Sequence, residues 1–158
     1  MAQQRPIPRT PTFNHVAMSL PAEALDEQGR SDILRFYGEV FGWTEMPTLT
    51  EDRQRLVLRA YSNEQFVFLV AEERPMQCAT MDHFGMSVAT PEELDGILAR
   101  ARKFQEQDGR VELVDRDTQD YKALKLHNFY VRYLLPMRIE VQCYEWEEGL
   151  GPDSMPKS

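Results

Sequence analysis

The sequence predicts an α+β fold made of two paired β-α-β-β-β units whose sheets curve around one cup. The first observation is a repeat: segment 13–20 (FNHVAMSL) returns as segment 81–88 (MDHFGMSV), with a histidine at the same place in each copy. His83 follows His15 by 68 positions. The second observation is that each copy precedes one helical pattern and then three β-prone runs. Two copies of one supersecondary unit therefore account for most of the chain.

The length of the chain sets the domain organisation. A chain of 158 residues has enough material for one well-formed core. Each unit by itself is small for an independent domain. We therefore expect a single domain over 13–146, composed of unit 13–73 and unit 81–146, with flexible tails at 1–12 and 147–158, where polar, Pro-rich or acidic residues dominate.

The first unit begins with a strand over 13–20, in which apolar residues alternate with His15 and its neighbours. A polar loop is expected up to residue 30. Ser31 is a candidate N-cap for a helix to Phe41, and Gly42 is a candidate stop. Three β-prone runs follow, near 44–50, 55–61 and 65–71.

The second unit repeats this order. A strand over 82–89 leads to Thr90-Pro91-Glu92-Glu93, which is a capping box with proline at the first helical position. Apolar residues then recur at helical spacing, namely Leu94, Ile97, Leu98 and Ala101. Strands are predicted near 110–115, 126–135 and 138–146.

The charge balance argues against one class of partner. The chain carries 26 acidic and 18 basic residues, a formal net charge of −8. Such a surface repels a phosphate backbone, so we expect no nucleic-acid partner. No apolar run approaches the ~20 residues of a membrane span, and the start lacks the apolar core of a signal peptide. We therefore expect a cytoplasmic protein without membrane contact. Cys78 and Cys143 lack zinc-site spacing, and two thiols fit them better than a lone disulfide.

The hairpin near the end of the chain determines which side chains face Glu140. Glu140 lies opposite the apolar face of strand 138–146, which is made by Ile139, Val141 and Cys143. We interpret Pro136-Met137 as a two-residue turn. This turn pairs Tyr133 with Glu140. It predicts that His127 and Tyr133 lie on the Glu140 face.

Three residues of metal-binding type fall on the same side of the predicted sheets. His15 and His83 each lie opposite the apolar stripe of their strand, as Glu140 does in the last strand. Because a sheet buries its apolar face under helices, all three are expected to project into the cup. Two imidazoles and one carboxylate form the facial triad that leaves open positions on Fe(II), although Mn, Co, Ni and Zn accept the same ligands. We therefore predict a divalent metal site at His15, His83 and Glu140.

These features together resemble the vicinal oxygen chelate superfamily of glyoxalases, extradiol dioxygenases, fosfomycin-resistance transferases and bleomycin-resistance proteins. The resemblance covers about residues 12–146. It rests on the paired units, the two histidine strands, the helix end at 36–43 (FYGEVFGW) and Glu140 in the last strand. It implies the paired-unit fold, a small-molecule substrate and a homodimer, with the units either closed within one chain or exchanged between two.

The resemblance also implies that one ligand position lacks a ligand. Members place up to four ligands on the first and last strands of the two units, and the position equivalent to Glu140 in the first unit falls near Phe68. Phenylalanine cannot bind a metal. Glyoxalase I and the epimerases use a fourth ligand, so the His/His/Glu set resembles the extradiol dioxygenases and the fosfomycin transferases instead.

Between these two branches the resemblance favours the dioxygenases slightly. Extradiol enzymes carry a histidine, a tyrosine and a proline turn before the ligand glutamate, and this chain has that order in His127, Tyr133, Pro136 and Glu140, with shorter gaps. The transferases have a threonine two residues after the first histidine, where this chain has Ala17. The favoured reaction is thus extradiol cleavage of a catecholate with Fe(II) and O2.

The same interpretation gives roles to residues around the metal. Tyr133 or His127 would supply a proton or position a substrate oxygen. Arg59 and Tyr61 share a face of their strand and would orient an anionic tail of the substrate. Phe66 and Phe68 would make an apolar wall.

Two other functions stay open at this point. One is transferase, isomerase or lyase chemistry at a divalent metal that acts as a Lewis acid. The other is a metal-free binding protein similar to the bleomycin-resistance proteins. Metal content separates the binding protein from both enzymes, and a yellow ring-cleavage product separates the dioxygenase from the transferase.

Overall fold

The computed structural model describes residues 11–152, so most of the two predicted tails, 1–10 and 153–158, lies outside the described residues. The first unit consists of β1 (His15–Leu20), α1 (Glu27–Phe41), β2 (Thr44–Glu45), β3 (Arg55–Ser62) and β4 (Gln65–Ala71). The second consists of β5 (His83–Val88), α2 (Pro91–Gln107), β6 (Glu112–Asp120), β7 (Leu124–Arg132) and β8 (Arg138–Trp146). Short 3-10 helices span Ala22–Leu25 and Pro47–Leu49. The predicted element order is confirmed in both units.

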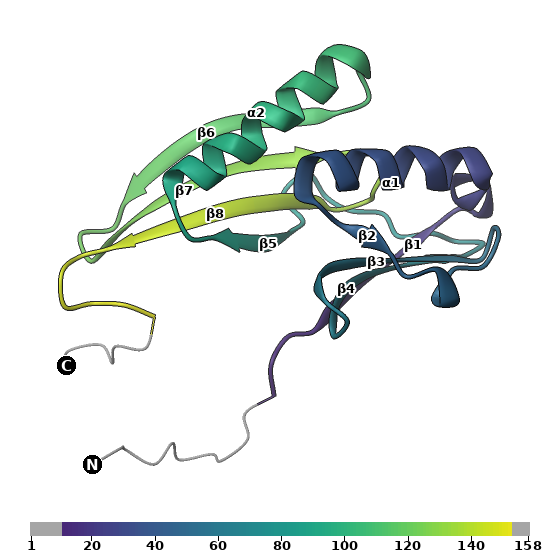
Figure 1. Cartoon of the computed structure of the whole chain (residues 1–158), viewed down its shortest axis with the longest axis horizontal. Helices are drawn as coiled ribbons and strands as arrows, with labels where there is room; N and C mark the ends of the chain where they lie inside the picture. The colour runs from purple at the N-terminus through teal and green to yellow at the C-terminus, as the bar shows by residue number, and fades with distance from the viewer. Residues whose placement is uncertain (1–10, 153–158) are drawn as a thin grey trace.

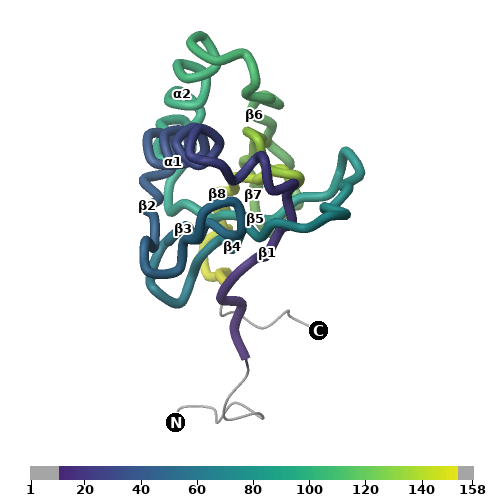
Figure 2. Tube along the Cα trace, turned by 90° about the vertical axis from the view of Figure 1, so that its right-hand side faces the viewer, coloured from purple at the N-terminus to yellow at the C-terminus, as the bar shows by residue number. Residues whose placement is uncertain are grey.

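Each unit forms one four-stranded mixed sheet with the same topology. The strand order is β1-β4-β3-β2 in the first sheet and β5-β8-β7-β6 in the second. In each sheet the first strand runs parallel to the last, and the other described neighbours are antiparallel. Figure 1 shows α1 and α2 side by side on the same side of the two sheets, and Figure 2 shows this arrangement from the side. The α+β fold with two paired units is confirmed.

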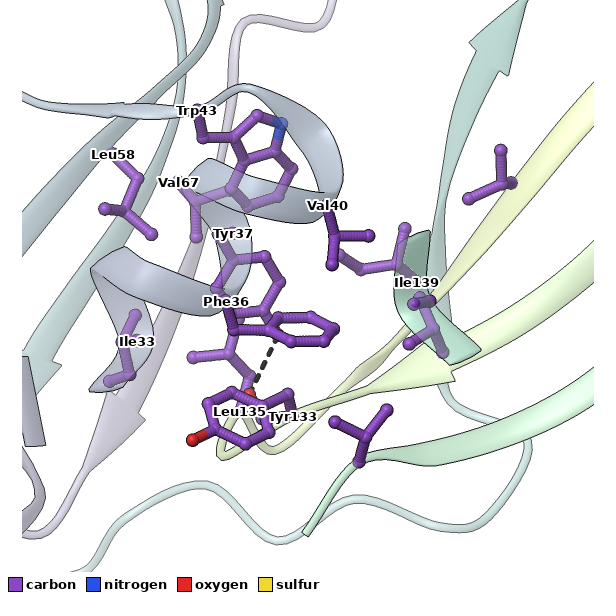
Figure 3. Packing of buried hydrophobic residues seen from close by; sticks show 14 of the residues in the cluster. Ile33, Phe36, Tyr37, Val40, Trp43, Leu58, Val67, Tyr133, Leu135 and Ile139 are labelled. Carbon is purple, nitrogen blue, oxygen red and sulfur yellow. Dashed lines mark hydrogen bonds between the residues drawn. The ribbon is translucent and has the colours of Figure 1, made fainter. Parts of the chain in front are cut away.

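One hydrophobic core extends across both units. Helix α1 buries Phe36 and Tyr37 completely, and these rings meet Tyr133 from the second unit (Figure 3). Phe36 stacks on Tyr133 with 4.6 Å between ring centroids, and the Tyr37 hydroxyl donates to the Tyr133 carbonyl oxygen at 2.9 Å. Burial of large aromatic rings is a major stabilising contribution in a core of this size. The two units are therefore joined on the helix-covered side of their sheets, and the opposite faces of the sheets stay open in the single chain.

Helix α1 begins earlier than the sequence indicated. The predicted N-cap was Ser31, but the structure caps the helix at Asp26, whose carboxylate accepts from the Gly29 backbone N–H at 2.8 Å. The first turn is polar, so the apolar periodicity that starts at Ile33 did not reveal it. Position 29 requires a glycine, because a Cβ there would lie 2.2 Å from the Ala24 carbonyl oxygen. At the other end Gly42 adopts φ 74° and ends the helix, as predicted.

Helix α2 begins as predicted, whereas several strand boundaries differ. Thr90 accepts from the Glu93 N–H at 3.2 Å, which confirms the cap. The run predicted near 44–50 contains only the two-residue strand β2, because Pro47 begins a 3-10 helix. Strand β6 continues to Asp120 through polar residues and contains a register shift.

The hairpin between β7 and β8 has a different register from the predicted one. Tyr130, not Tyr133, pairs with Glu140. The cause is the connection: β7 ends at Arg132, and residues 133–137 form a loop in which Leu134 has φ 56°. This loop is longer than the predicted two-residue turn by an odd number of residues. Because side chains alternate along a strand, an odd shift moves every β7 side chain to the other face.

The helices of the described region also bear on the membrane question. No helix within residues 11–152 has the length and apolar character needed to cross a membrane.

Candidate metal site

Two of the predicted ligands lie together on the open face of the second sheet. His83 begins β5, and Glu140 lies in the adjacent strand β8, opposite Gly85. The His83 Nε2 atom is 3.2 Å from the Glu140 Oε2 atom. The Glu140 side chain is only 8% exposed, so its carboxylate is buried against the surface of the sheet rather than in bulk solvent. Gly85 has no side chain to cover it.

The second carboxylate oxygen of Glu140 is held by two donors from β7. The Asn128 amide donates to Oε1 at 2.5 Å, and the Tyr130 hydroxyl donates to the same atom at 2.9 Å. Asn128 is buried, and the Tyr130 ring meets the His83 ring edge-on with 5.4 Å between centroids. Both donors fix the carboxylate plane and leave Oε2 directed at His83. Such partners are typical of groups that orient a metal ligand.

The hydrogen bonds of His83 define which nitrogen is available. The Nδ1–H of His83 donates to the Met81 carbonyl oxygen at 2.6 Å. In the neutral ring Nε2 then carries a lone pair, and this lone pair faces the Glu140 Oε2 atom, which is also an acceptor. Two acceptors in contact require a cation between them, either a proton or a metal ion. Two ligands about 2.1 Å from one ion lie about 3 Å apart at a right angle. The His83–Glu140 pair fits a divalent metal.

The burial of Tyr130 matters for its chemistry. Desolvation, followed by the hydrogen bond to the Glu140 carboxylate, raises the pKa of the Tyr130 phenol. The phenol therefore keeps its proton at neutral pH. It remains a donor toward Glu140.

The Nδ1 atom of His15 is hydrogen-bonded to an oxygen, as that of His83 is, but His15 lies apart from the His83–Glu140 pair. Its Nδ1 hydrogen-bonds the Asn14 side-chain oxygen at 2.8 Å, which leaves Nε2 free, and its ring stacks on Phe66 with 4.9 Å between centroids. His15 is exposed. No group of three metal-binding side chains is present within residues 11–152. A single chain thus brings together His83 and Glu140 and does not bring His15 to them.

The strand registers confirm that Phe68 occupies the fourth ligand position, the one predicted to lack a ligand. In the second unit Gly85 of β5 pairs with Glu140, and two residues earlier His83 pairs with Arg138. In the first unit Ala17, which is two residues after His15, pairs with Phe68. Phe68 is therefore the positional equivalent of Glu140.

Tyr133 is not on the Glu140 face, which corrects the prediction. It leaves the strand at the end of β7 and turns into the core, where its hydroxyl donates to Asp108 Oδ2 at 2.7 Å and accepts from Arg110 at 2.9 Å. Arg110 also pairs with Asp32 of α1 at 2.8 Å. The hydrogen bonds from Arg110 and then from Tyr133 hold the pKa of the Asp108 carboxyl well below its usual range. Burial raises the pKa of the Tyr133 phenol. Tyr133 joins the two units structurally.

His127 is also on the helix-covered face rather than the Glu140 face. Its Nδ1 contacts the Thr118 hydroxyl at 2.8 Å and Arg116 at 3.2 Å, and its Nε2 contacts the Glu145 carboxylate. The hydrogen bond from His127 lowers the pKa of the Glu145 carboxyl. Arg116 in turn pairs with Asp95 of α2 at 2.7 Å. This network attaches α2 to its sheet.

His127→Ala is expected to weaken the fold without affecting metal binding. The substitution removes three polar contacts at a buried position and leaves Arg116 with fewer partners, so the free energy of unfolding should fall by about 1–3 kcal/mol. Chemical denaturation measures this change, and elemental analysis of the folded variant measures the metal. A metal content below that of the wild-type protein would contradict this prediction and indicate that His127 contributes to metal binding.

Tyr130→Phe and Tyr133→Phe are expected to have opposite effects. Loss of the Tyr130 hydroxyl removes one of the two donors that orient the Glu140 carboxylate, so metal affinity should fall by about 10-fold or more while stability changes little. Loss of the Tyr133 hydroxyl removes the contact with Asp108, so stability should fall by about 0.5–1.5 kcal/mol with unchanged metal affinity. Metal titration and thermal unfolding of both variants test this. Equal effects on metal affinity would contradict it.

The three substrate-binding candidates lie on the His15 side of the first sheet. Arg59 pairs with Phe66, the register neighbour of His15, and Phe68 is the next residue of β4 on the same face. Tyr61 is 82% exposed and lines a hollow of about 480 Å³ with His15. This hollow is predominantly apolar and is lined by Phe13, Asn14, His15, Val16, Ala60, Tyr61, Gln65, Phe66, Val67, Phe84, Gly85 and Met86.

Asn128 and Tyr130 are the site residues that the sequence analysis missed. A usable signal was present: in β7 the apolar Phe129 and Val131 alternate with Asn128, Tyr130 and Arg132. This alternation places the polar set on the Glu140 face without any assumption about the turn.

Comparisons with known proteins agree with this architecture. No protein-family model and no curated protein sequence matches the chain. Among solved structures, a glyoxalase/bleomycin resistance protein/dioxygenase from Nocardioides is similar with a TM-score of 0.59, 14% identity and coverage of 93% of this chain and 91% of that one. A glyoxalase/bleomycin resistance protein from Albidiferax ferrireducens has a TM-score of 0.55 and 17% identity, and the likeness covers 83% and 98% of the two chains.

A third similar structure is the fosfomycin resistance protein FosX from Listeria monocytogenes. Its TM-score is 0.57 at 12% identity, with 85% of this chain and 94% of that chain covered. At these identities the likeness concerns the fold. The chain therefore has the fold of the vicinal oxygen chelate superfamily, which confirms the resemblance seen in the sequence.

Proposed function

We propose that the protein is a metal-dependent enzyme that acts on a small molecule, with a His/His/Glu site shared between two copies of the chain. The observation that carries this proposal is the contact of His83 Nε2 with Glu140 Oε2 at 3.2 Å. Their other polar atoms are already engaged, Nδ1 by Met81 and Oε1 by Asn128 and Tyr130. The two remaining acceptors converge on the same point, which is the position for a divalent cation.

A second copy is the proposed source of the third ligand. His15 has a free Nε2 atom, and the surface around it carries exposed apolar side chains, with Phe13 fully exposed and Tyr61 82% exposed. Exposed apolar groups next to a hollow are typical of a surface that another molecule covers. In a twofold dimer, the His15 face of one copy would cover the Glu140 face of the other. The site would then contain both histidines and the glutamate.

The residues of this chain would act on the substrate through position and proton control. The Tyr130 phenol keeps its proton and donates a hydrogen bond to the carboxylate ligand, so its oxygen can accept a hydrogen bond from a hydroxyl group of a bound substrate and position it. Phe66 and Phe68 of the partner would exclude water from one side. A bound divalent ion supplies positive charge that favours the deprotonated form of substrate oxygens.

As the reaction we propose extradiol-type ring cleavage of a catecholate with Fe(II) and O2. The ligand set supports it, since two histidines and one carboxylate form the facial triad of Fe(II) oxygenases. Tyr130 takes the role first given to Tyr133, because it is the tyrosine on the Glu140 face. We assign no substrate contact to His127 or Tyr133, because neither side chain is on the Glu140 face.

The test begins with protein purified without a chelator. We expect about one divalent ion per chain by elemental analysis, and a yellow product from at least one catechol after anaerobic loading with iron. A metal-loaded protein that gives no coloured product would contradict the dioxygenase reaction and favour Lewis-acid chemistry, such as isomerisation or thiol transfer. Protein that binds no divalent ion even after loading would overturn the proposal and favour a metal-free binding protein.

A further inference from the structure

Arg138 lies at the edge of the His83–Glu140 pair. It is the first residue of β8 and the register partner of His83 in the parallel strand β5. It lies two residues before Glu140, so its side chain points to the same face of the sheet. The residue is half-buried. A cation is thus placed next to both predicted ligands from the second unit.

Arg138 differs from the other half-buried arginines in having no acidic partner. Arg30 pairs with Asp52 at 2.5 Å, Arg116 with Asp95 at 2.7 Å, and Arg132 with Glu112 at 2.7 Å. Within residues 11–152, no ion pair or hydrogen bond joins the Arg138 guanidinium to another side chain. A partly desolvated guanidinium without an anion is unusual in a chain of net charge −8.

The two neighbouring acids, Glu140 and Asp82, have partners other than Arg138. Glu140 uses Oε1 for Asn128 and Tyr130 and directs Oε2 at His83. Asp82 accepts from the Ala79 backbone N–H at 2.8 Å. The Arg138 guanidinium is thus left without an anionic partner within residues 11–152, on the sheet face that carries His83 and Glu140.

We propose that Arg138 binds an anionic oxygen group, such as a carboxylate, on the substrate whose other oxygens occupy the metal site. This inference rests on the proposed function and specifies its substrate class. Guanidinium binds carboxylates through two parallel hydrogen bonds, which gives both affinity and orientation. Two residues along a strand span about 7 Å, so the backbone positions of Arg138 and Glu140 are close enough for one small substrate to contact both side chains. The substrate is an acid rather than a neutral molecule.

Binding of a matched pair of probes tests this assignment without turnover. The probes are catechol and 3,4-dihydroxybenzoate, which differ only in the carboxylate, and titration calorimetry measures both on Zn(II)-loaded protein. We expect the wild-type protein to bind the benzoate at least about 10-fold more tightly, the range of a hydrogen bond to a charged group. Arg138→Gln should reduce this preference to within about twofold, and Arg138→Lys should keep part of it because the charge remains.

Two controls separate the assignment from its alternatives. Arg74→Gln removes an exposed arginine outside the sheets and should leave the preference unchanged. Arg59→Gln examines the arginine that the sequence favoured for this role. Loss of the preference in Arg59→Gln and not in Arg138→Gln overturns the proposal. Equal wild-type affinity for the two probes, or no measurable binding of either, overturns it as well.

The metal content of the same samples distinguishes this failure from failure of the proposed function. Zn(II) binding with no carboxylate preference contradicts only the role of Arg138. Failure to load Zn(II) contradicts the metal site itself.

Discussion

Glu140→Gln is expected to raise the dissociation constant for the divalent metal by at least about 100-fold while the fold stays intact. Removal of an orienting partner already lowers metal affinity by about 10–100-fold, and here a ligand itself loses its charge. The variant should fold normally because the amide oxygen of glutamine still accepts from Asn128 and Tyr130. Loss of a charge on a side chain only 8% exposed also removes a desolvation penalty. The metal-free variant should unfold at the wild-type temperature or above.

Competition with a chromogenic chelator measures the dissociation constant, and circular dichroism measures unfolding. Glu112→Gln is the matched control, since this glutamate lies in the same sheet but pairs with Arg132 at an exposed position. It should retain wild-type affinity. His83→Ala should lose the metal as Glu140→Gln does, because both residues contribute the facing acceptors. Unchanged affinity in Glu140→Gln would mean that the predicted site is not where the protein binds metal.

Features that depend on nearby residues could be predicted from the sequence. The Thr90 cap and the Gly42 stop are set by hydrogen bonds and backbone conformation within a few residues. The equivalence of His15 and His83 follows from the repeat, and the registers confirm that Phe68 is the equivalent of Glu140. These predictions needed only local chemistry and the alternation of side chains along strands.

The start of α1 could not be predicted from apolar periodicity. Its first turn is polar, and its position depends on Gly29 lying against the Ala24 carbonyl oxygen of the preceding 3-10 helix. That contact is defined only when both segments are folded.

The β7–β8 register failed for a different reason. It depends on the loop 133–137, in which Leu134 adopts a left-handed conformation. This conformation is usually indicated by a glycine or asparagine in the sequence, and the loop has neither. Tyr133 is drawn out of the strand by stacking on Phe36 of the other unit, a contact 97 positions away in sequence. Turn chemistry was a weaker guide than the alternation in β7 itself, which assigns Tyr130 to the Glu140 face.

The site as a whole cannot be predicted from one chain, because His15 belongs to a face that the chain leaves open. A complementation experiment examines this point directly. Homodimers of His15→Ala and homodimers of Glu140→Gln should each hold almost no metal. A heterodimer of the two, purified through a different affinity tag on each chain, should regain about half of the wild-type metal content, since one of its two sites is complete.

A second heterodimer separates sharing between copies from closure within one chain. It combines the double variant His15→Ala/Glu140→Gln with a wild-type chain. If the copies exchange His15, both of its sites lack one ligand, so it should hold almost no metal, whereas closure within one chain would leave the wild-type site complete. The two arrangements therefore predict reversed results for the two heterodimers. We expect metal in the first and almost none in the second, because His15 lies apart from His83 and Glu140 within the chain. The reverse result would require the two units of one chain to close upon each other.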